Sequence, residues 1–290
     1  MRILPVDYHH LTTLIFLYFM LFSNYSFGFE PPRRLLSDSN YIAKPYDKFS
    51  VSLGGFIAAY HNGINIGSDQ LGLGVTIDLE NALGLDVSSW AMRSKINYRF
   101  GERSRHGLSF GFFSNTRSAV KTPTQEIIIG DLVIPIGSEI RSNYTYSIYR
   151  LKYDYSFFQD DRVSLGASFG FFVLPVKFKV EVDGHGSSVT NFIAPLPTLG
   201  VRTDFLITPK FFFHQSIEVL YLSFEGFTGS LVDLDISVEF RPIHNFGFGL
   251  GFNRYDLDLS VKTGAYPGLD FFGNISSSYS GLYLFARFSL

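Results

Sequence analysis

Three residue types of a hydrolytic triad lie close together in one short segment. His214, Ser216 and Glu218 occupy alternate positions, so in an extended strand their side chains share one face. Two positions along a strand span about 6.6 Å, whereas a nucleophile must lie about 2.6–3.2 Å from its base. These three residues therefore cannot form a triad by themselves.

A partner for the histidine is predicted on the preceding strand. If TPK (208–210) is a three-residue hairpin turn, Asp204 lies opposite His214 and Arg202 lies opposite Ser216. An acid–imidazole pair can serve catalysis, but ion pairs and buried histidines with a purely structural role are more common. We therefore favour a structural pair and assign no catalytic residue.

The other candidates for chemistry are weaker. The chain has no cysteine, which excludes a disulfide framework, a thiolate metal site and a cysteine nucleophile. His61 and His185 fall in connections without a metal-ligand partner at usable spacing, and His106 and His244 fall in short turns. No phosphate-binding or metal motif is present. We expect neither a metal nor a cofactor.

Segments with apolar residues at every second position dominate the chain and predict β-strands. A helical period is absent, apart from a single turn in DLENALGL. Ten strands are expected, at 49–59, 90–100, 107–117, 144–158, 162–173, 193–207, 211–222, 231–241, 246–256 and 279–290.

The connections between these segments alternate in length. Short turns are expected at 101–106, 159–161, 208–210 and 242–245. Long connections are expected at 60–89, 118–143, 174–192 and 257–278, with 223–230 as a shorter exception. Short turns on one side and long loops on the other are typical of a barrel that spans a membrane.

The composition agrees with a surface that needs few charges. Charged residues make up 17% of the chain, below the roughly 25% of soluble domains, and the 32 Phe and 17 Tyr help to raise the aromatic share to 17%. The net charge of -2 supplies no basic footprint, so nucleic acid is excluded as a partner.

The N-terminus has the pattern of a secretory signal peptide. An apolar run, LTTLIFLYFMLF, follows a short basic start, and small residues precede an expected cleavage after Gly28. The run is shorter than the roughly 20 residues of a membrane-spanning helix. We predict a signal peptide at 1–28, a mobile periplasmic lead-in at 29–47 and a single barrel domain at 48–290.

The face that touches lipid can be inferred from FGFGLGFN (246–253). Its phenylalanines and Leu250 share one face, and its three glycines share the other with Asn253. Glycine weakens a strand unless neighbouring side chains need the space. In a crowded lumen, neighbouring side chains do need this space, so we expect the glycines to point inward and the apolar faces to point outward. In LVDLDISVEFR, Leu234 and Val238 then also point outward. Trp90 and Tyr98 then lie near the two membrane interfaces.

The last segment, YSGLYLFARFSL, alternates up to Leu290 and resembles the terminal strand of bacterial outer-membrane β-barrel proteins. The resemblance covers roughly residues 49–290. It implies an all-β, transmembrane, antiparallel up-and-down barrel of about ten strands in the cell outer membrane. Eight strands remain open, and so do twelve if 70–79 and 125–135 also cross. The implied partners are outer-membrane lipid and lipopolysaccharide, and the insertion machinery that reads the C-terminal strand.

With this orientation, charged side chains line the lumen, and the acidic strand 231–241 faces the basic strands 90–100 and 144–158. Either the charges fill the lumen or a narrow passage remains. The predicted lumen charges are Arg93, Lys95, Arg99, Arg150, Lys152, Arg202, Asp204, His214, Glu218, Asp233, Asp235 and Glu239.

These observations favour a non-catalytic outer-membrane barrel, either a structural or surface-contact barrel or a narrow solute channel. The alternative is an outer-membrane lipid- or peptide-hydrolysing barrel. The resemblance implies that such enzymes keep their chemistry near the outer leaflet, whereas His214 is expected near a periplasmic turn. We therefore predict no enzymatic activity. The oligomeric state is not indicated by the sequence.

Overall fold

A computed structural model describes most of the predicted barrel domain, namely residues 44–66, 77–124, 126–129, 132–183, 186–224, 226–261 and 273–290. The predicted signal peptide (1–28) and residues 29–43 of the lead-in lie outside the described residues. Among the described residues, no helix has the length and apolar character needed to cross a membrane.

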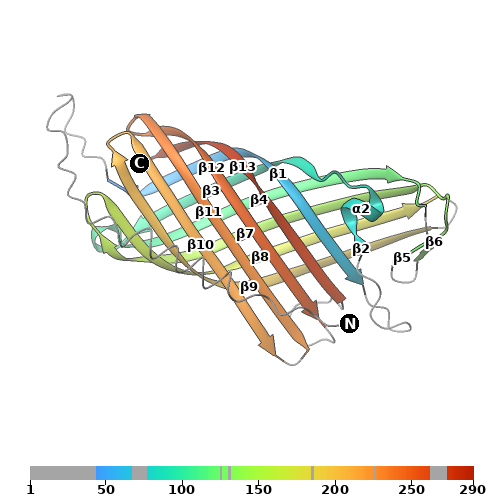
Figure 1. Cartoon of the computed structure of the whole chain (residues 1–290). Helices are drawn as coiled ribbons and strands as arrows, with labels where there is room; N and C mark the ends of the chain where they lie inside the picture. Colours follow the sequence, from blue (N-terminus) through green and yellow to red (C-terminus); the bar gives the residue numbers. More distant parts are fainter. Residues whose placement is uncertain are drawn as a thin grey trace. The chain divides into compact units, whose positions relative to one another are not determined.

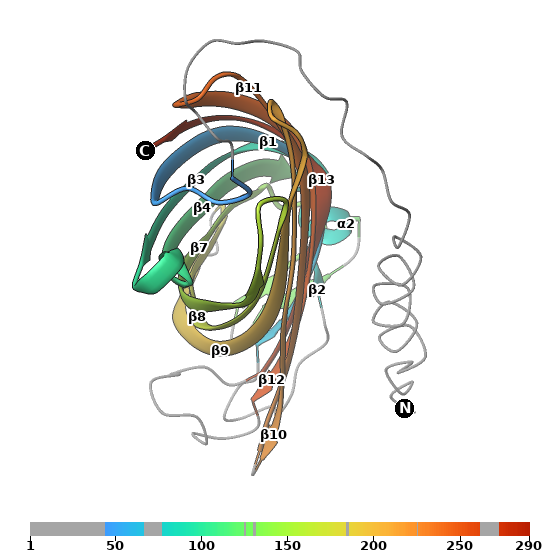
Figure 2. The ribbon, with the colours of Figure 1, turned by 90° about the vertical axis from the view of Figure 1, so that its left-hand side faces the viewer.

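Ten long strands form one antiparallel sheet in chain order (Figure 1). The last strand pairs with the first over 17 residue pairs, so the sheet closes on itself, and Figure 2 shows β1 beside β13. This confirms the ten-stranded barrel. The strands are β1 (Phe49–Ile66), β3 (Ser88–Phe100), β4 (His106–Lys121), β7 (Ile140–Gln159), β8 (Val163–Val182), β9 (Gly186–Thr208), β10 (Phe211–Phe224), β11 (Phe227–Ile243), β12 (Phe246–Val261) and β13 (Gly273–Ser289).

The smaller elements lie in the connections. β2 (Ile77–Asp78) pairs with the end of β1 and leads into α2 (Leu79–Leu83), which is the single helical turn expected in DLENALGL. A separate hairpin is formed by β5 (Ile127–Ile129) and β6 (Leu132–Ile134), so this segment does not add strands to the barrel. A short 3-10 helix, η1 (Glu102–Ser104), lies in the first short turn.

The two ends of the barrel differ in their connections. One end, here called the turn end, carries the short turns and both described chain ends, and the backbone N–H of Phe49 donates to the carbonyl of Leu290 at 3.1 Å. In outer-membrane barrels the short turns face the periplasm. The opposite end, here called the loop end, carries α2 and the β5–β6 hairpin (Figure 1).

The strands reach further toward the loop end than expected. β8 continues to Val182 and β9 begins at Gly186, so the predicted long connection at 174–192 is wrong. In this part of β8, the apolar residues Phe178 and Val180 are buried inside and Lys177 is exposed outside. The alternation therefore continues along the strand, but the polarity of its two faces is exchanged.

We call this loop-end part of the wall the extension. Its interior is mostly apolar, and outward charges and hydroxyls are common on its outer face. It comprises residues 58–66, 114–121, 140–147, 174–182, 186–194, 227–232, 254–261 and 273–280.

Nearer the turn end, the outward face is the apolar one, as the sequence predicts. Phe248 and Leu250 of β12 are 50% and 52% exposed on the outside. The inward glycines of the same strand make room for neighbours, since a Cβ on Gly251 would lie 2.2 Å from the ring of Tyr283. Outward apolar residues on the other strands complete a belt that faces lipid.

Candidate functional site

The structure places all twelve predicted lumen charges inside the barrel, and His214 lies at the centre of their turn-end group. Its Nδ1 is 2.9 Å from Asp204 Oδ1 and its Nε2 is 3.2 Å from Glu239 Oε2. β9 and β10 pair in the predicted register, with Asp204 opposite His214 and Arg202 opposite Ser216. The imidazole therefore bridges two carboxylates that belong to different strands.

Arginines surround the first of these carboxylates. Asp204 forms ion pairs with Arg202 of its own strand and with Arg99 of β3, the latter at 3.1 Å. Arg202 also contacts Asp154 of β7 at 2.5 Å. Because β3 and β9 are not neighbours in the sheet, the Arg99–Asp204 pair crosses the lumen.

The second carboxylate connects the lumen to the end of the lead-in. Glu239 is fully buried and contacts Arg241 at 2.5 Å and Arg287 at 2.7 Å. Arg241 in turn holds Asp47 through two hydrogen bonds of 2.7 and 2.8 Å. We expected residues 29–47 to be mobile, but Asp47 is bound to the buried guanidinium of Arg241, which contacts both this carboxylate and that of Glu239.

Nearer the middle of the barrel, three further ion pairs join strands that are not neighbours. Arg93 contacts Asp235 at 2.6 Å and Arg150 contacts Asp233 at 3.1 Å. Lys152 pairs with Glu218. The acidic strand β11 thus meets the basic strands β3 and β7 by direct contact. The long side chains close the distance without a bridging water.

Lys95 differs from the other predicted cations. Within the described part of the chain it has no ion pair within 4.0 Å, and it lines a cavity of about 110 Å³ with Lys152 and Glu218. About 10–15 Å³ of such volume holds one water, so this space has room for several. Water there can hydrate Lys95 and the Glu218 Oε2 atom, which accepts no hydrogen bond from protein.

Beyond the ion pairs, toward the loop end, aromatic side chains fill the lumen. Tyr279 stacks on Phe113 at 5.1 Å and on Tyr255 at 5.0 Å between ring centroids. Tyr255 also contacts Tyr146 at 6.3 Å. We call these four residues, together with Phe56, the aromatic layer. They come from five strands, including β7 and β12, which lie opposite each other in the ring of ten.

The contacts of the His214 ring argue against a role as general base. Both ring nitrogens already contact carboxylates, and Arg287 lies 3.1 Å from Nε2. A general base needs a free nitrogen within hydrogen-bond reach of the group that it deprotonates. The pair of Asp204 and His214 is thus part of an ionic network that ties six strands together, namely β3, β7, β9, β10, β11 and β13.

Three members of this network were not among the predicted lumen residues, namely Asp47, Arg241 and Arg287. The alternation contains the signal for two of them, because Arg241 shares a face with Glu239 and Arg287 shares a face with Tyr283. Asp47 precedes the first strand, where no periodicity applies, so the sequence holds no signal for it.

Comparison with solved structures agrees with this architecture. The fold is similar to that of the outer membrane protease OmpT from Escherichia coli, with 8% identity, a TM-score of 0.54, and coverage of 86% of this chain and 98% of that chain. The attachment invasion locus protein Ail of Yersinia pestis matches with 13% identity and a TM-score of 0.36, covering 83% of this chain and 99% of that one. Neisserial surface protein A matches with 11% identity and a TM-score of 0.33, covering 84% and 97%.

No protein-family model and no curated protein sequence matches this chain. The closed ten-stranded sheet, the belt of outward apolar side chains and the inward charges agree with the likeness to OmpT. The chain therefore has the fold of the bacterial outer-membrane β-barrels.

Proposed function

We propose that this protein is a non-catalytic outer-membrane barrel whose lumen is closed to solutes and whose loop end acts as a contact surface. The observation that carries the proposal is the contact between Tyr146 of β7 and Tyr255 of β12, strands on opposite sides of the ring. With Tyr279 stacked between Tyr255 and Phe113, these rings form a layer across the lumen that would block a solute.

The length of the wall supports a role for the loop end. β9 contains 23 residues. At about 3.3 Å per residue and a tilt of about 40°, a strand of this length rises about 58 Å, more than twice the roughly 25 Å apolar band of such barrels. The extension therefore raises the loop end well above the membrane, where it can meet other molecules.

A narrow channel is the second candidate, favoured by the cavity of about 110 Å³ lined by Arg93, Lys95 and Asp235. This cavity belongs to the turn-end half. A smaller space of about 30 Å³ lies next to it, where Phe56 and Tyr279 of the aromatic layer form part of the lining. A solute would have to displace that layer to pass.

Conductance across planar lipid bilayers tests the closed lumen. We expect the folded parent to give no steady current, and a variant with Phe113, Tyr146, Tyr255 and Tyr279 all changed to Ala to conduct. Both proteins must first show the heat-dependent shift in gel mobility of a closed barrel. Steady single-channel currents from the parent would overturn the proposal in favour of the channel.

Peptide hydrolysis is the remaining candidate, because the similar structure OmpT is described as a protease. The engaged ring nitrogens of His214 argue against hydrolysis at this residue. We expect the parent and His214→Ala to show the same absence of peptide and lipid A turnover. Activity in the parent that disappears in His214→Ala would contradict the proposed function.

A further inference from the structure

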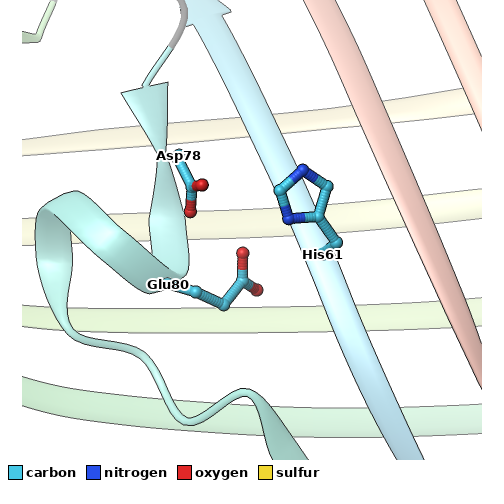
Figure 3. A group of neighbouring side chains, drawn as sticks. All are labelled: His61, Asp78 and Glu80. Carbon is cyan, nitrogen blue, oxygen red and sulfur yellow. The ribbon is translucent and has the colours of Figure 1, made fainter.

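Three side chains from separate elements converge at the loop end of β1. His61 of β1, Asp78 of β2 and Glu80 of α2 each offer one ligand atom, and these atoms lie within 4.8 Å of one another (Figure 3). We propose that they form a binding site for a divalent transition cation, of which Zn²⁺ is the representative. The spacing of 17 residues between His61 and Asp78 gave no indication of such a site in the sequence.

Both carboxylates are held in place by other residues. Asp78 caps α2, with the Asn81 N–H donating to its Oδ1 at 2.9 Å. Glu80 accepts the Asn62 N–H at 2.8 Å and the Arg117 guanidinium at 2.6 Å. Hydrogen-bonded carboxylates of this kind are typical of metal ligands, because the outer contacts orient the oxygen that binds the ion.

These contacts leave acceptor positions unused. A carboxylate has about four lone-pair positions. Glu80 uses three of them, for the backbone and side-chain amides of Asn62 and for Arg117, which leaves one on Oε2. Asn81 donates to both oxygens of Asp78, at 2.9 Å to Oδ1 and 2.7 Å to Oδ2.

Of the three side chains, the His61 imidazole is the one whose position no structural role explains. Among the described residues, no ion pair within 4.0 Å and no hydrogen bond is found for the His61 ring, although both carboxylates lie within 4.8 Å. A neutral imidazole presents one acceptor nitrogen. One imidazole nitrogen and two carboxylate oxygens therefore converge on the same space, which is an arrangement that a bound cation satisfies.

The distances and the charge also suit a transition metal. Ligands about 2.1 Å from a tetrahedral ion are about 3.4 Å apart, so the exposed His61 side chain has to move by only about 1 Å. With Arg117 counted, the two carboxylates leave a net charge of -1. An imidazole among the ligands favours Zn²⁺, Ni²⁺ or Cu²⁺ over the hard ions Ca²⁺ and Mg²⁺.

Zn²⁺ titration of the folded full-length protein by calorimetry, with chelator competition, tests the site. We expect saturable binding of one Zn²⁺ per chain, which the chelator reverses. His61→Ala should weaken binding at least tenfold. Asp78→Asn should do the same while keeping the helix cap, since Asn is also a good N-cap.

The matched control is His106→Ala at the turn end, which removes a histidine that contacts Tyr153 and should leave Zn²⁺ affinity unchanged. Unaltered heat-modifiable gel mobility shows that each variant is folded. The proposal is overturned if the parent shows no saturable Zn²⁺ binding, or if His61→Ala and Asp78→Asn both bind as tightly as the parent.

Discussion

Strand β12 shows within one element how the membrane-crossing wall differs from the extension. Its outward residues nearest the turn end are Phe246, Phe248, Leu250 and Phe252, and its next outward residues are Arg254, Asp256, Asp258 and Ser260. The inward face changes in the opposite sense, from three glycines and Asn253 to Tyr255, Leu257, Leu259 and Val261.

This difference follows from the medium outside the wall. Next to acyl chains, the outward side chains must be apolar, and the charges are enclosed and paired. Above the membrane, water replaces lipid, so the extension obeys the rule of a soluble barrel and buries its apolar side chains inside. A single chain therefore uses two opposite patterns, and the aromatic layer lies where they meet.

The largest expected effect is the loss of an inward apolar side chain near this boundary. Phe172 of β8 is fully buried, and Phe172→Ala should lower the free energy of unfolding by about 3–5 kcal/mol, because it leaves a cavity. Its neighbour Phe171 faces lipid and is 41% exposed, so Phe171→Ala should cost less. Urea unfolding in lipid vesicles measures both, and equal losses would contradict the assigned faces.

Removing one partner of a lumen ion pair should have the next largest effect. The side chain of Asp233 is 4% exposed, and Asp233→Asn leaves the Arg150 guanidinium without its carboxylate. We expect a loss of about 3 kcal/mol in the same unfolding assay, since an uncompensated charge remains in a poorly hydrated site. Stability equal to that of the parent would indicate that water in the neighbouring cavity already screens the pair.

A charge placed on the outward face should affect stability differently in the lipid-facing belt and in the extension. Leu250→Arg faces acyl chains and should cost about 2 kcal/mol, whereas Ser260→Arg on the same face of β12 should change stability by less than about 0.5 kcal/mol. Refolding yield in vesicles, read from heat-modifiable gel mobility, gives a second measure. If Ser260→Arg is as harmful as Leu250→Arg, the lipid belt reaches further than we propose.

The smallest effect is expected for an ion pair on the outer face of the extension. Arg254 and Asp256 lie 2.8 Å apart, but their side chains are 63% and 38% exposed. Asp256→Asn should cost less than about 1 kcal/mol, because water screens the pair. Comparison with Asp233→Asn gives the loss of stability for the same chemical change in the membrane-crossing wall and in the extension.

Much of the fold could be predicted because period-two alternation is a local property. All ten strands were located from it, and the hairpin register that pairs Asp204 with His214 followed from the short turn at 208–210. The predicted strands are too short at the loop end. In VKFKVEV (176–182) the alternation persists, but the apolar residues face inward, contrary to the pattern of a lipid-facing strand.

The candidate site was predictable in part for the same reason. Alternation assigns Asp233, Asp235 and Glu239 to the lumen, because successive side chains point to opposite faces. It does not say which base each acid meets. That choice depends on the tilt and stagger of strands four positions apart in the ring, which bring Arg93 to Asp235 and Arg150 to Asp233.

The sequence by itself determined the strands, their faces and the class of barrel, because each depends on residues that are close along the chain. Only the tertiary structure decided which charges and rings meet across the lumen, that Asp47 contacts Arg241, and that His61 lies beside Asp78 and Glu80. Those contacts join residues from separate elements: Asp47 reaches Arg241 because the sheet closes, and His61 reaches Asp78 because β2 pairs with the end of β1.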